Sequence, residues 1–234
     1  MNQTGSLSAE YVDLYSIRLD LPQTDITNCL QWLSEAERAR ANKLLSSTKS
    51  REFIVTRANL KRILTQALDE SAANITIANE PGGKPYLDCG NRHPRVRFSV
   101  SHSHDLALIA LTLDHAIGVD VERIRAEVDH ASLSRRFFSP AEFEALQQCD
   151  RALRLRAFFA TWTRKEALVK AHGKGIALGL QQFDVSVDPD KPPHVLATRW
   201  DSADTVDWQL HNIETDNNYM ASLATGSQLS IRYR

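Results

Sequence analysis

A short stretch in the second half of the chain, Ile-Gly-Val-Asp-Val-Glu at 117–122, places two acidic side chains where they can act together. Apolar residues alternate there with glycine, aspartate and glutamate, which is the pattern of a β-strand. Because a strand turns successive side chains to opposite faces, Asp120 and Glu122 are expected to share one face, roughly 7 Å apart. Two carboxylates on one face suit the binding of a divalent cation.

A second stretch, Trp-Thr-Arg-Lys-Glu-Ala-Leu-Val-Lys at 162–170, has the spacing of a helix. Trp162, Glu166 and Lys170 recur every four residues and are expected to lie on one helical face. If this helix packs beside the strand at 117–122, three carboxylates and a lysine converge. Such a group of side chains can hold Mg²⁺, which takes oxygen ligands, on a phosphate group.

Each of these pairs also has an ordinary explanation. Asp120 and Glu122 fit the solvent face of a half-covered antiparallel strand, and Glu166 with Lys170 fits a surface ion pair. Against the first explanation, Asp and Glu are poor strand formers, and neighbouring carboxylates repel one another unless a cation lies between them. Against the second, aromatic residues precede the ion pair, so the helix is expected to be largely buried and its charges to need partners.

Several residues of the first half have the chemistry of anion binding. Ser101 and His102 end an expected strand, where they either hydrogen-bond an anion or cap the next element. Arg57 lies within the apolar stripe of its helix, either as a snorkelling arginine or as a phosphate ligand. The sequence Gly-Gly-Lys-Pro at 82–85 is either a plain turn or a backbone that touches a ligand, with Lys84 adding charge.

The region 35–62 is locally basic. It carries eight Lys and Arg residues against three Glu, whereas the whole chain has a net charge of −1. An anionic ligand is therefore expected to dock there. The basic residues are Arg38, Arg40, Lys43, Lys49, Arg51, Arg57, Lys61 and Arg62.

The composition bounds the class of protein. The 234 residues are 42% hydrophobic and 24% charged, which is ordinary for a globular protein. The net charge of −1 gives no long-range attraction for nucleic acid or for an anionic membrane. Cys29, Cys89 and Cys149 form no CxxC pair, which favours reduced thiols. Neither a signal peptide nor an apolar stretch of roughly 20 residues is evident, so we expect a cytoplasmic protein.

Strands and helices are mixed in both halves, which predicts two α+β lobes joined near 114–117. The expected strands are 11–19, 75–78, 96–100, 106–113, 117–123, 183–188, 195–200, 206–213, 219–225 and 228–233. The expected helices are 24–33, one that begins after Ser34, 48–69, a stretch that ends at Phe138, one that begins after Ser139, and 152–172.

In their order along the chain, these motifs resemble those of the 4′-phosphopantetheinyl transferases of the larger, surfactin-synthetase-activating (Sfp-like) type. The match covers nearly the whole length. It comprises Gly-Gly-Lys-Pro at 82–85, Phe-Ser-Val-Ser-His-Ser at 98–103, the strand motif at 117–122, Arg-Phe-Phe-Ser at 136–139, and the helix motif at 162–170 followed by Gly-Lys-Gly at 173–175.

The resemblance implies an α+β fold of two similar lobes related by a pseudo-twofold axis, each a small, mostly antiparallel sheet packed with helices. Coenzyme A (CoA) would bind in the cleft between the lobes, which forms the active site, and the protein would be a monomer. We expect an N-terminal lobe at 1–116 on the nucleotide side and a C-terminal lobe at 117–234 that holds the metal and catalytic residues.

The resemblance also assigns roles to individual residues. It implies a Mg²⁺ site, which Mn²⁺ could also fill, at Asp120, Glu122 and Glu166, and a catalytic group of Asp120, Glu166 and Lys170. The implied CoA-binding residues are Arg57, Gly83, Lys84, Pro85, Ser101, His102 and Lys170. Ser99 departs from the asparagine usual in the family. The ligand of the CoA 3′-phosphate is left open among Arg40, Lys43 and Arg51.

The implied activity is Mg²⁺-dependent transfer of the 4′-phosphopantetheine arm of CoA to a serine of an apo acyl, peptidyl or polyketide carrier protein, with release of adenosine 3′,5′-bisphosphate. This is the reaction of a holo-acyl-carrier-protein synthase. Glu166 is the expected base, acting directly or through a water at the metal. The alternatives are a Mg²⁺-dependent pyrophosphatase or phosphodiesterase for CoA-like nucleotides and a non-catalytic carrier-binding module. The sequence leaves open which carrier is modified, whether acyl-CoA is accepted, and whether Glu122 ligates the metal directly.

Overall fold

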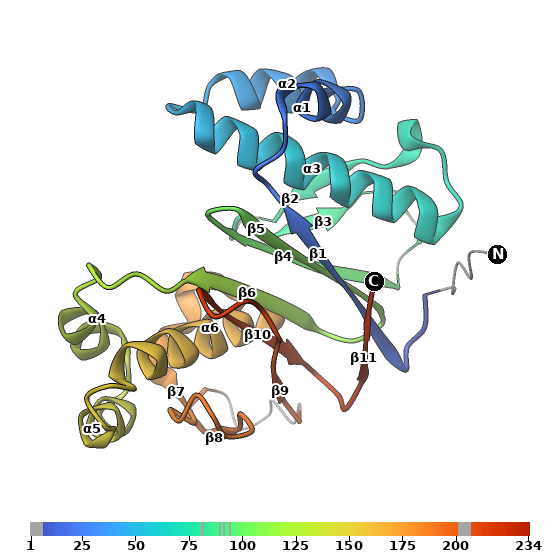
Figure 1. Ribbon diagram of the computed structural model, residues 1–234. Coiled ribbons are helices and arrows are strands. Elements are labelled where there is room, and N and C mark those ends of the chain that lie inside the picture. The colour runs from blue at the N-terminus through green and yellow to red at the C-terminus, as the bar shows by residue number, and fades with distance from the viewer. Residues whose placement is uncertain (1–6, 81, 89, 91, 94, 201–206) are drawn as a thin grey trace.

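The structure of the protein is a computed structural model that describes residues 7–80, 82–88, 90, 92–93, 95–200 and 207–234. Helices and small sheets are mixed along the chain, so the expected α+β class is confirmed (Figure 1). The pairing of β1 with β11 is parallel, and the other strand pairs within the described residues are antiparallel. The relation of the two halves by a pseudo-twofold axis stays a prediction.

The described residues form the following elements. The helices are α1 (Gln23–Leu30), α2 (Glu35–Asn42), α3 (Ser47–Leu68), α4 (His130–Phe137), α5 (Pro140–Gln148) and α6 (Arg154–His172), with 3-10 turns at Ala72–Asn74, Gly175–Leu178 and Leu180–Gln182. The strands are β1 (Tyr11–Arg18), β2 (Ile77–Asn79), β3 (Pro85–Leu87), β4 (Val96–Ser103), β5 (Leu106–Leu113), β6 (Ile117–Arg123), β7 (Phe183–Val185), β8 (Val195–Thr198), β9 (Gln209–Asn212), β10 (Tyr219–Thr225) and β11 (Ser230–Tyr233).

A four-stranded sheet in the order β11-β1-β5-β4 forms one layer of the molecule. Helix α3 packs on one face of this sheet, where Leu60 and Leu64 join Ile109 in a buried cluster. On the other face, Val12 and Leu108 belong to a core that also contains residues of β6 and β10. The sheet is thus buried on both sides, which explains why β5 reads as an almost continuous apolar run.

A second sheet, in the order β6-β10-β9, lies between the first sheet and α6 (Figure 1). Helix α6 approaches β6 closely because Gly118 has no side chain to hold it off. A Cβ atom built on Gly118 would lie 2.0 Å from the carbonyl oxygen of Ala167 and 2.4 Å from the nitrogen of Ala171. The motif glycine therefore sets the distance between the strand that carries Asp120 and the helix that carries Glu166.

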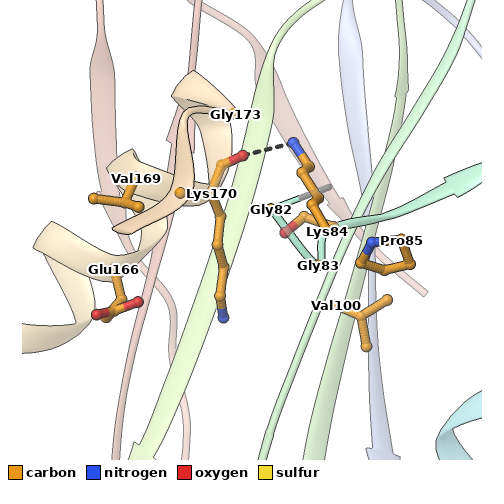
Figure 2. A pocket seen from close by; sticks show the side chains of 11 residues that line it. Gly82, Gly83, Lys84, Pro85, Val100, Glu166, Val169, Lys170 and Gly173 are labelled. Carbon is orange, nitrogen blue, oxygen red and sulfur yellow. Dashed lines mark hydrogen bonds between the residues drawn. The ribbon is translucent and has the colours of Figure 1, made fainter. Parts of the chain in front are cut away.

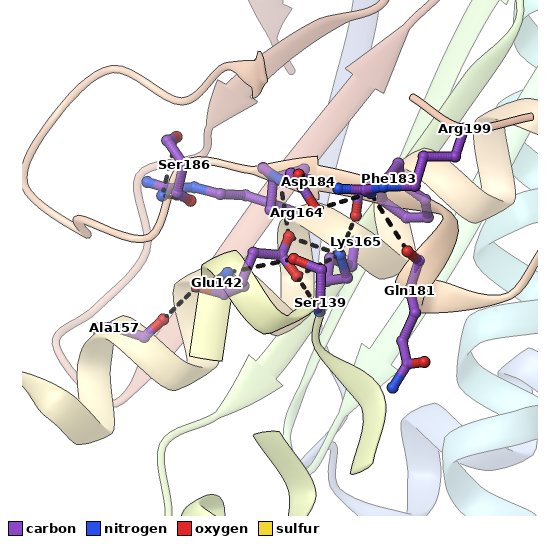
Figure 3. A network of polar contacts seen from close by, with 12 residues as sticks. Ser139, Glu142, Ala157, Arg164, Lys165, Gln181, Phe183, Asp184, Ser186 and Arg199 are labelled. Atoms are coloured by element: carbon purple, nitrogen blue, oxygen red, sulfur yellow. Dashed lines mark hydrogen bonds and ion pairs between the residues drawn. The ribbon is translucent and has the colours of Figure 1, made fainter. Parts of the chain in front are cut away.

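The other side of α6 is fixed by a buried ion pair (Figure 3). The Lys165 ammonium donates to both carboxylate oxygens of Glu142, at 2.6 and 2.7 Å, and to the carbonyl of Phe183 at 2.7 Å. Glu142 also accepts from the backbone amides of Ser139 and Val185. Burial raises the pKa of Glu142 and lowers the pKa of Lys165, and their mutual attraction opposes both shifts. Rotation of α6 about its axis would separate the two partners and leave buried charges uncompensated. The pair therefore fixes the rotation of the helix.

Most elements lie where the sequence predicts them, and the differences at β2, β3 and β9 are as follows. Ile75, expected to begin a strand at 75–78, is buried after a 3-10 turn, and β2 begins at Ile77. The strand β3 was not expected, because its three residues begin with a proline; it pairs with β2 in a hairpin whose turn includes Gly83. The first residue of the strand expected at 206–213 lies outside the described residues, and β9 spans only Gln209–Asn212.

The boundary expected at 116 stays a prediction, and one strand qualifies it. Strand β11, from the end of the chain, pairs with β1 in the sheet of the first half.

Two expectations drawn from the composition concern the cysteines and membrane-spanning segments. Cys29 and Cys149 are free thiols, whereas Cys89 lies outside the described residues. Within the described part of the chain, no helix is both long and apolar enough to cross a membrane.

The close contact at Gly118 leads to a testable prediction. Gly118→Ala should lower the free energy of unfolding by about 2 kcal/mol or more, because the backbone atoms of α6 that the new methyl group meets cannot move aside cheaply. Thermal unfolding should then occur several degrees lower than in the wild type. Gly82→Ala is the matched control, because its Cβ atom would meet nothing within 4 Å. Equal melting temperatures for the two variants would contradict the close packing of α6 on β6.

Candidate active site

Asp120 lies at the centre of the candidate site. It is 5% exposed and projects from β6 between β4 and α6. Its Oδ1 accepts hydrogen bonds from Lys170 Nζ at 2.7 Å and from Ser101 Oγ at 2.8 Å. Its Oδ2 is buried and has no hydrogen-bond partner among the described residues. A buried carboxylate oxygen without a donor is costly, so this oxygen is suited to a ligand that supplies positive charge.

The charge of Asp120 affects the two glutamates of the predicted group, Glu122 and Glu166. Burial, and next the charge of Asp120, raises the pKa of Glu122 and of Glu166 above the ordinary value. Glu122 accepts a hydrogen bond from Ser103 Oγ at 2.9 Å. No hydrogen bond to the side chain of Glu166 is made by the residues that the structure describes. Asp120 thus lies close enough to both glutamates to disfavour their charged forms.

The metal assignment itself stays a prediction. Within the described residues, no group of three or more His, Cys, Asp or Glu side chains is gathered closely enough to hold a metal ion. The donor chemistry nevertheless fits Mg²⁺, because the unpartnered oxygen of Asp120 is a hard ligand and the neighbouring carboxylates repel one another. Asp120, Glu122 and Glu166 are the residues that would hold the ion.

Lys170 reaches Asp120 from α6 and forms an ion pair with it. Besides its contact with the carboxylate, its ammonium donates to the carbonyl oxygen of Val119 at 3.1 Å. The side chain is 28% exposed, so part of the charge still faces the adjoining cavity. The predicted Lys170 is therefore brought together with Asp120, and it shares α6 with Glu166.

A cavity of about 310 Å³ opens between the β2–β3 hairpin and the end of α6 (Figure 2). Glu166 and Lys170 line it from the helix, and Gly83, Lys84 and Pro85 line it from the hairpin. The site residues predicted at 83–85 are thus brought to the same cavity as the two predicted residues of α6, although nearly ninety residues separate them in sequence.

Lys84 has a role in this cavity that the sequence did not suggest. Its ammonium donates to the carbonyl oxygen of Lys170 at 2.6 Å and to that of Ile117 at 3.2 Å. Because the last carbonyls of a helix lack partners within it, Lys84 satisfies one of them and connects the hairpin to both α6 and β6. Burial lowers the pKa of Lys84.

A second cavity, of about 200 Å³, adjoins the first, with which it shares Gly83, Pro85 and Val100. Arg57 and His102 line it, together with Arg40. The Nη1 atom of Arg57 is buried without a hydrogen-bond partner among the described residues, and both arginines lie over the ring of Phe53. The Nε atom of Arg57 lies 3.6 Å from a carboxylate oxygen of Glu37, and the unpartnered Nη1 is suited to a phosphate ligand.

Arg40, Lys43 and Arg51, the three candidate ligands of the CoA 3′-phosphate, lie in different places. Arg40 lines the second cavity, whereas Arg51 lines a separate cavity at the start of α3, and Lys43 is exposed after the end of α2. His102 is 36% exposed, and its Nδ1 lies 3.8 Å from the buried carboxylate of Glu52. Burial lowers the pKa of His102, and the charge of Glu52 opposes that shift.

Sequence reasoning missed Ser103 and Glu52, which touch predicted site residues. Ser103 follows Ser101 by two residues and therefore shares its face of β4, so the period of a strand could have identified it. Glu52 lies on α3, and its approach to His102 is a contact between distant segments that no local pattern reports. Ser101 donates to Asp120 in this structure, and its predicted binding of phosphate stays a prediction.

The site combines a buried acidic residue, Asp120, with an adjoining cavity lined by Arg40 and Arg57, an arrangement that suits a ligand with phosphate groups. Comparison with known proteins identifies the family. Residues 116–224 match the family model of the 4′-phosphopantetheinyl transferase superfamily, and residues 22–113 match the model of the N-terminal part of 4′-phosphopantetheinyl transferases.

Individual relatives extend the match. The 4′-phosphopantetheinyl transferase HetI of Nostoc sp. is 33% identical over 94% of this chain and 89% of its own length. A putative 4′-phosphopantetheinyl transferase of Synechocystis sp. is 35% identical over 76% of this chain and 70% of its own. The 4′-phosphopantetheinyl transferase Sfp of Bacillus subtilis is 24% identical over 76% and 77%. The chain belongs to the 4′-phosphopantetheinyl transferase superfamily, as its motifs predict.

The contacts of Lys84 yield a prediction about stability. Lys84→Met keeps the aliphatic stem but removes the ammonium, so the carbonyl oxygens of Lys170 and Ile117 lose their donor. Hydrogen bonds from charged groups contribute about 1.5–3 kcal/mol, and we expect a loss of that size in chemical denaturation. Lys174→Met is the control, because Lys174 is exposed just beyond α6. A loss no larger than in this control would mean that Lys84 does not hold the hairpin to α6.

Proposed function

We propose that this protein transfers the 4′-phosphopantetheine arm of CoA to a serine of an apo carrier protein, in the manner of a holo-acyl-carrier-protein synthase. The observation that carries the proposal is Asp120, which is buried, bonded to Lys170 and left with one unpartnered oxygen. Membership of the superfamily supports CoA as the substrate and carrier proteins as the partners. HetI and Sfp are both named as 4′-phosphopantetheinyl transferases, which is the same activity.

The proposed reaction is a phosphoryl transfer. The hydroxyl oxygen of the carrier serine attacks the phosphorus of CoA that bears the pantetheine arm. The bond from that phosphorus to the bridging oxygen breaks, and adenosine 3′,5′-bisphosphate leaves with the electron pair. The serine proton passes to a base, so that charge and atoms balance.

Three residues carry the chemistry in this proposal. Glu166 takes the serine proton; in support, its carboxylate lines the cavity and receives no hydrogen bond from the described residues. Lys170 neutralises charge that grows on the leaving phosphate, since its ammonium faces the same cavity. Asp120 holds Lys170 in place. Bound Mg²⁺ would act as a Lewis acid on the pyrophosphate, held by Asp120, Glu122 and Glu166.

The adjoining cavity is proposed to receive the nucleotide end of CoA. Arg57 and His102 supply donors for its phosphates, and Arg40 is our choice for the 3′-phosphate because it lines this cavity. Gly83 and Pro85 line both cavities, so the hairpin would lie along the middle of the bound molecule. Ser101 reaches the substrate only by releasing Asp120, so we propose for it a role in orienting that carboxylate.

The remaining expectations stay predictions. They are a cytoplasmic location, a monomeric state, and no binding of nucleic acid or membranes. The two-lobed arrangement with a boundary at 116 belongs with them. The arginines Arg135, Arg136 and Arg151 are exposed and could meet an acidic carrier, whereas the exposed Arg156 is paired with Asp190.

The test is the intact mass of apo carrier proteins after incubation with this protein, CoA and Mg²⁺, with EDTA as a parallel sample. A gain of one phosphopantetheine arm that EDTA abolishes is expected. CoA cleaved without modification of any carrier would instead identify a hydrolase. CoA bound without either change would identify a binding module.

Substitutions in the acidic group should separate chemistry from folding. We expect Asp120→Ala and Lys170→Ala each to reduce the rate of transfer about a hundredfold or more, because charge on the leaving phosphate is then less well stabilised. The rate of carrier modification measures this. Asp25→Ala, an exposed aspartate on α1, should transfer at the wild-type rate. Wild-type rates for both site variants would refute the assignment of Asp120 and Lys170.

Substitution of Arg57 should affect binding of the substrate. Arg57→Ala should weaken CoA binding about tenfold or more in calorimetric titration, because a charge-assisted contact with a phosphate is lost. Arg57→Lys should recover only part of the affinity, since an ammonium lacks the fork of two donors. Arg62→Ala, on the exposed side of α3, is the control. Equal affinities for Arg57→Ala and Arg62→Ala would exclude Arg57 from the binding site.

A further inference from the structure

The two sheets meet along β4 and β6, and serine side chains bridge the two strands. These strands are not neighbours in any hydrogen-bonded sheet of the described residues, although they are in extensive contact. Ser99 Oγ accepts from the amide of Val119 at 3.0 Å. Two residues further, Ser101 Oγ donates to Asp120 at 2.8 Å. The bridges follow the period of a strand, since alternate residues share one face.

Ser103 completes this row, and its contacts are the most informative. Its hydroxyl donates to Glu122 Oε2 at 2.9 Å and accepts from the backbone amide of Arg123 at 3.1 Å. The hydrogen bond from the amide of Arg123 fixes the oxygen of Ser103 relative to the backbone of β6. Because a hydroxyl has only one proton, that proton is then directed to the carboxylate of Glu122.

Glu122 needs such a restraint. It is half-buried at the end of β6, and the charge of Asp120 on the same strand repels it. Of the described side chains, that of Ser103 makes the one hydrogen bond recorded to the Glu122 carboxylate. Without it, the carboxylate is free to rotate away from Asp120, and two ligands that must converge on one ion would separate.

We propose that Ser103 is a positioning residue that orients the carboxylate of Glu122 toward a divalent cation shared with Asp120. The inference rests on the proposed function, because it requires the predicted metal site. It adds a residue of the first half, on β4, to a site whose expected ligands all come from β6 and α6. The hydroxyl acts through Glu122 and touches neither the ion nor the substrate.

The experiment measures the affinity for Mn²⁺ directly. Electron paramagnetic resonance of free Mn²⁺ is followed during titration of the full chain in the presence of CoA and without a carrier. Ser103→Ala should weaken Mn²⁺ binding about tenfold or more, which is the usual effect of losing a group that orients a metal ligand. Ser103→Thr, which keeps the hydroxyl, should bind within about twofold of the wild type.

Ser99→Ala is the matched control, because it removes a serine from the same face of β4 that bonds only to the backbone of β6. It should bind Mn²⁺ like the wild type, and thermal unfolding of each variant verifies that it is folded. Equal affinities for Ser103→Ala and the wild type, or equal losses in Ser103→Ala and Ser99→Ala, would overturn the inference while leaving the proposed function intact. If Asp120→Ala bound Mn²⁺ as tightly as the wild type, the metal site and the inference would both be overturned.

Discussion

The burial of one carboxylate, Asp120, is the constraint on which the rest of the site depends. A charge that is 5% exposed must be compensated nearby, and Lys170 and Ser101 do so from two different elements. Lys170 can reach Asp120 only because α6 lies directly against β6, and Gly118 permits that approach. Lys84 then holds the hairpin to the end of the same helix. The residues that form the cavity are therefore positioned by the requirements of a single buried charge.

Helix α6 is buried nearly all round, and it serves structure and chemistry on different faces. Lys165 and Glu166 are adjacent in sequence, yet Lys165 is fully buried in an ion pair with Glu142, whereas Glu166 lines the cavity. Arg164 is also buried, and its guanidinium donates to the carbonyl oxygens of Ser186 and Asp188. Burial lowers the pKa of Arg164 to about 10. The polar contacts of these two residues prevent the helix from rotating and so keep Glu166 and Lys170 directed at the site.

The sequence predicted most elements and which of them carry the candidate site residues, because both depend on local periodicity, whereas the roles of those residues stay predictions. Alternation revealed β6 and the shared face of Asp120 and Glu122, and the spacing of four revealed Glu166 and Lys170. Contacts between distant segments were not predictable in this way. The bonds of Lys84 to Lys170 and of Ser103 to Glu122 depend on how two sheets meet, which no window of sequence contains. The short strand β3 was missed because its partner β2, and not its composition, makes it a strand.

The pairing of β11 with β1 has a consequence for how the chain folds. The ion pair of Arg232 with Asp13 spans 219 residues, and the strand ladder beside it is similarly long in range. Closing a loop of that length costs chain entropy before any contact repays it, so completion of the first sheet is expected to be a late, slow step. Until β11 pairs with it, that edge of β1 presents backbone groups without partners, and such an edge is prone to pair with strands of other molecules.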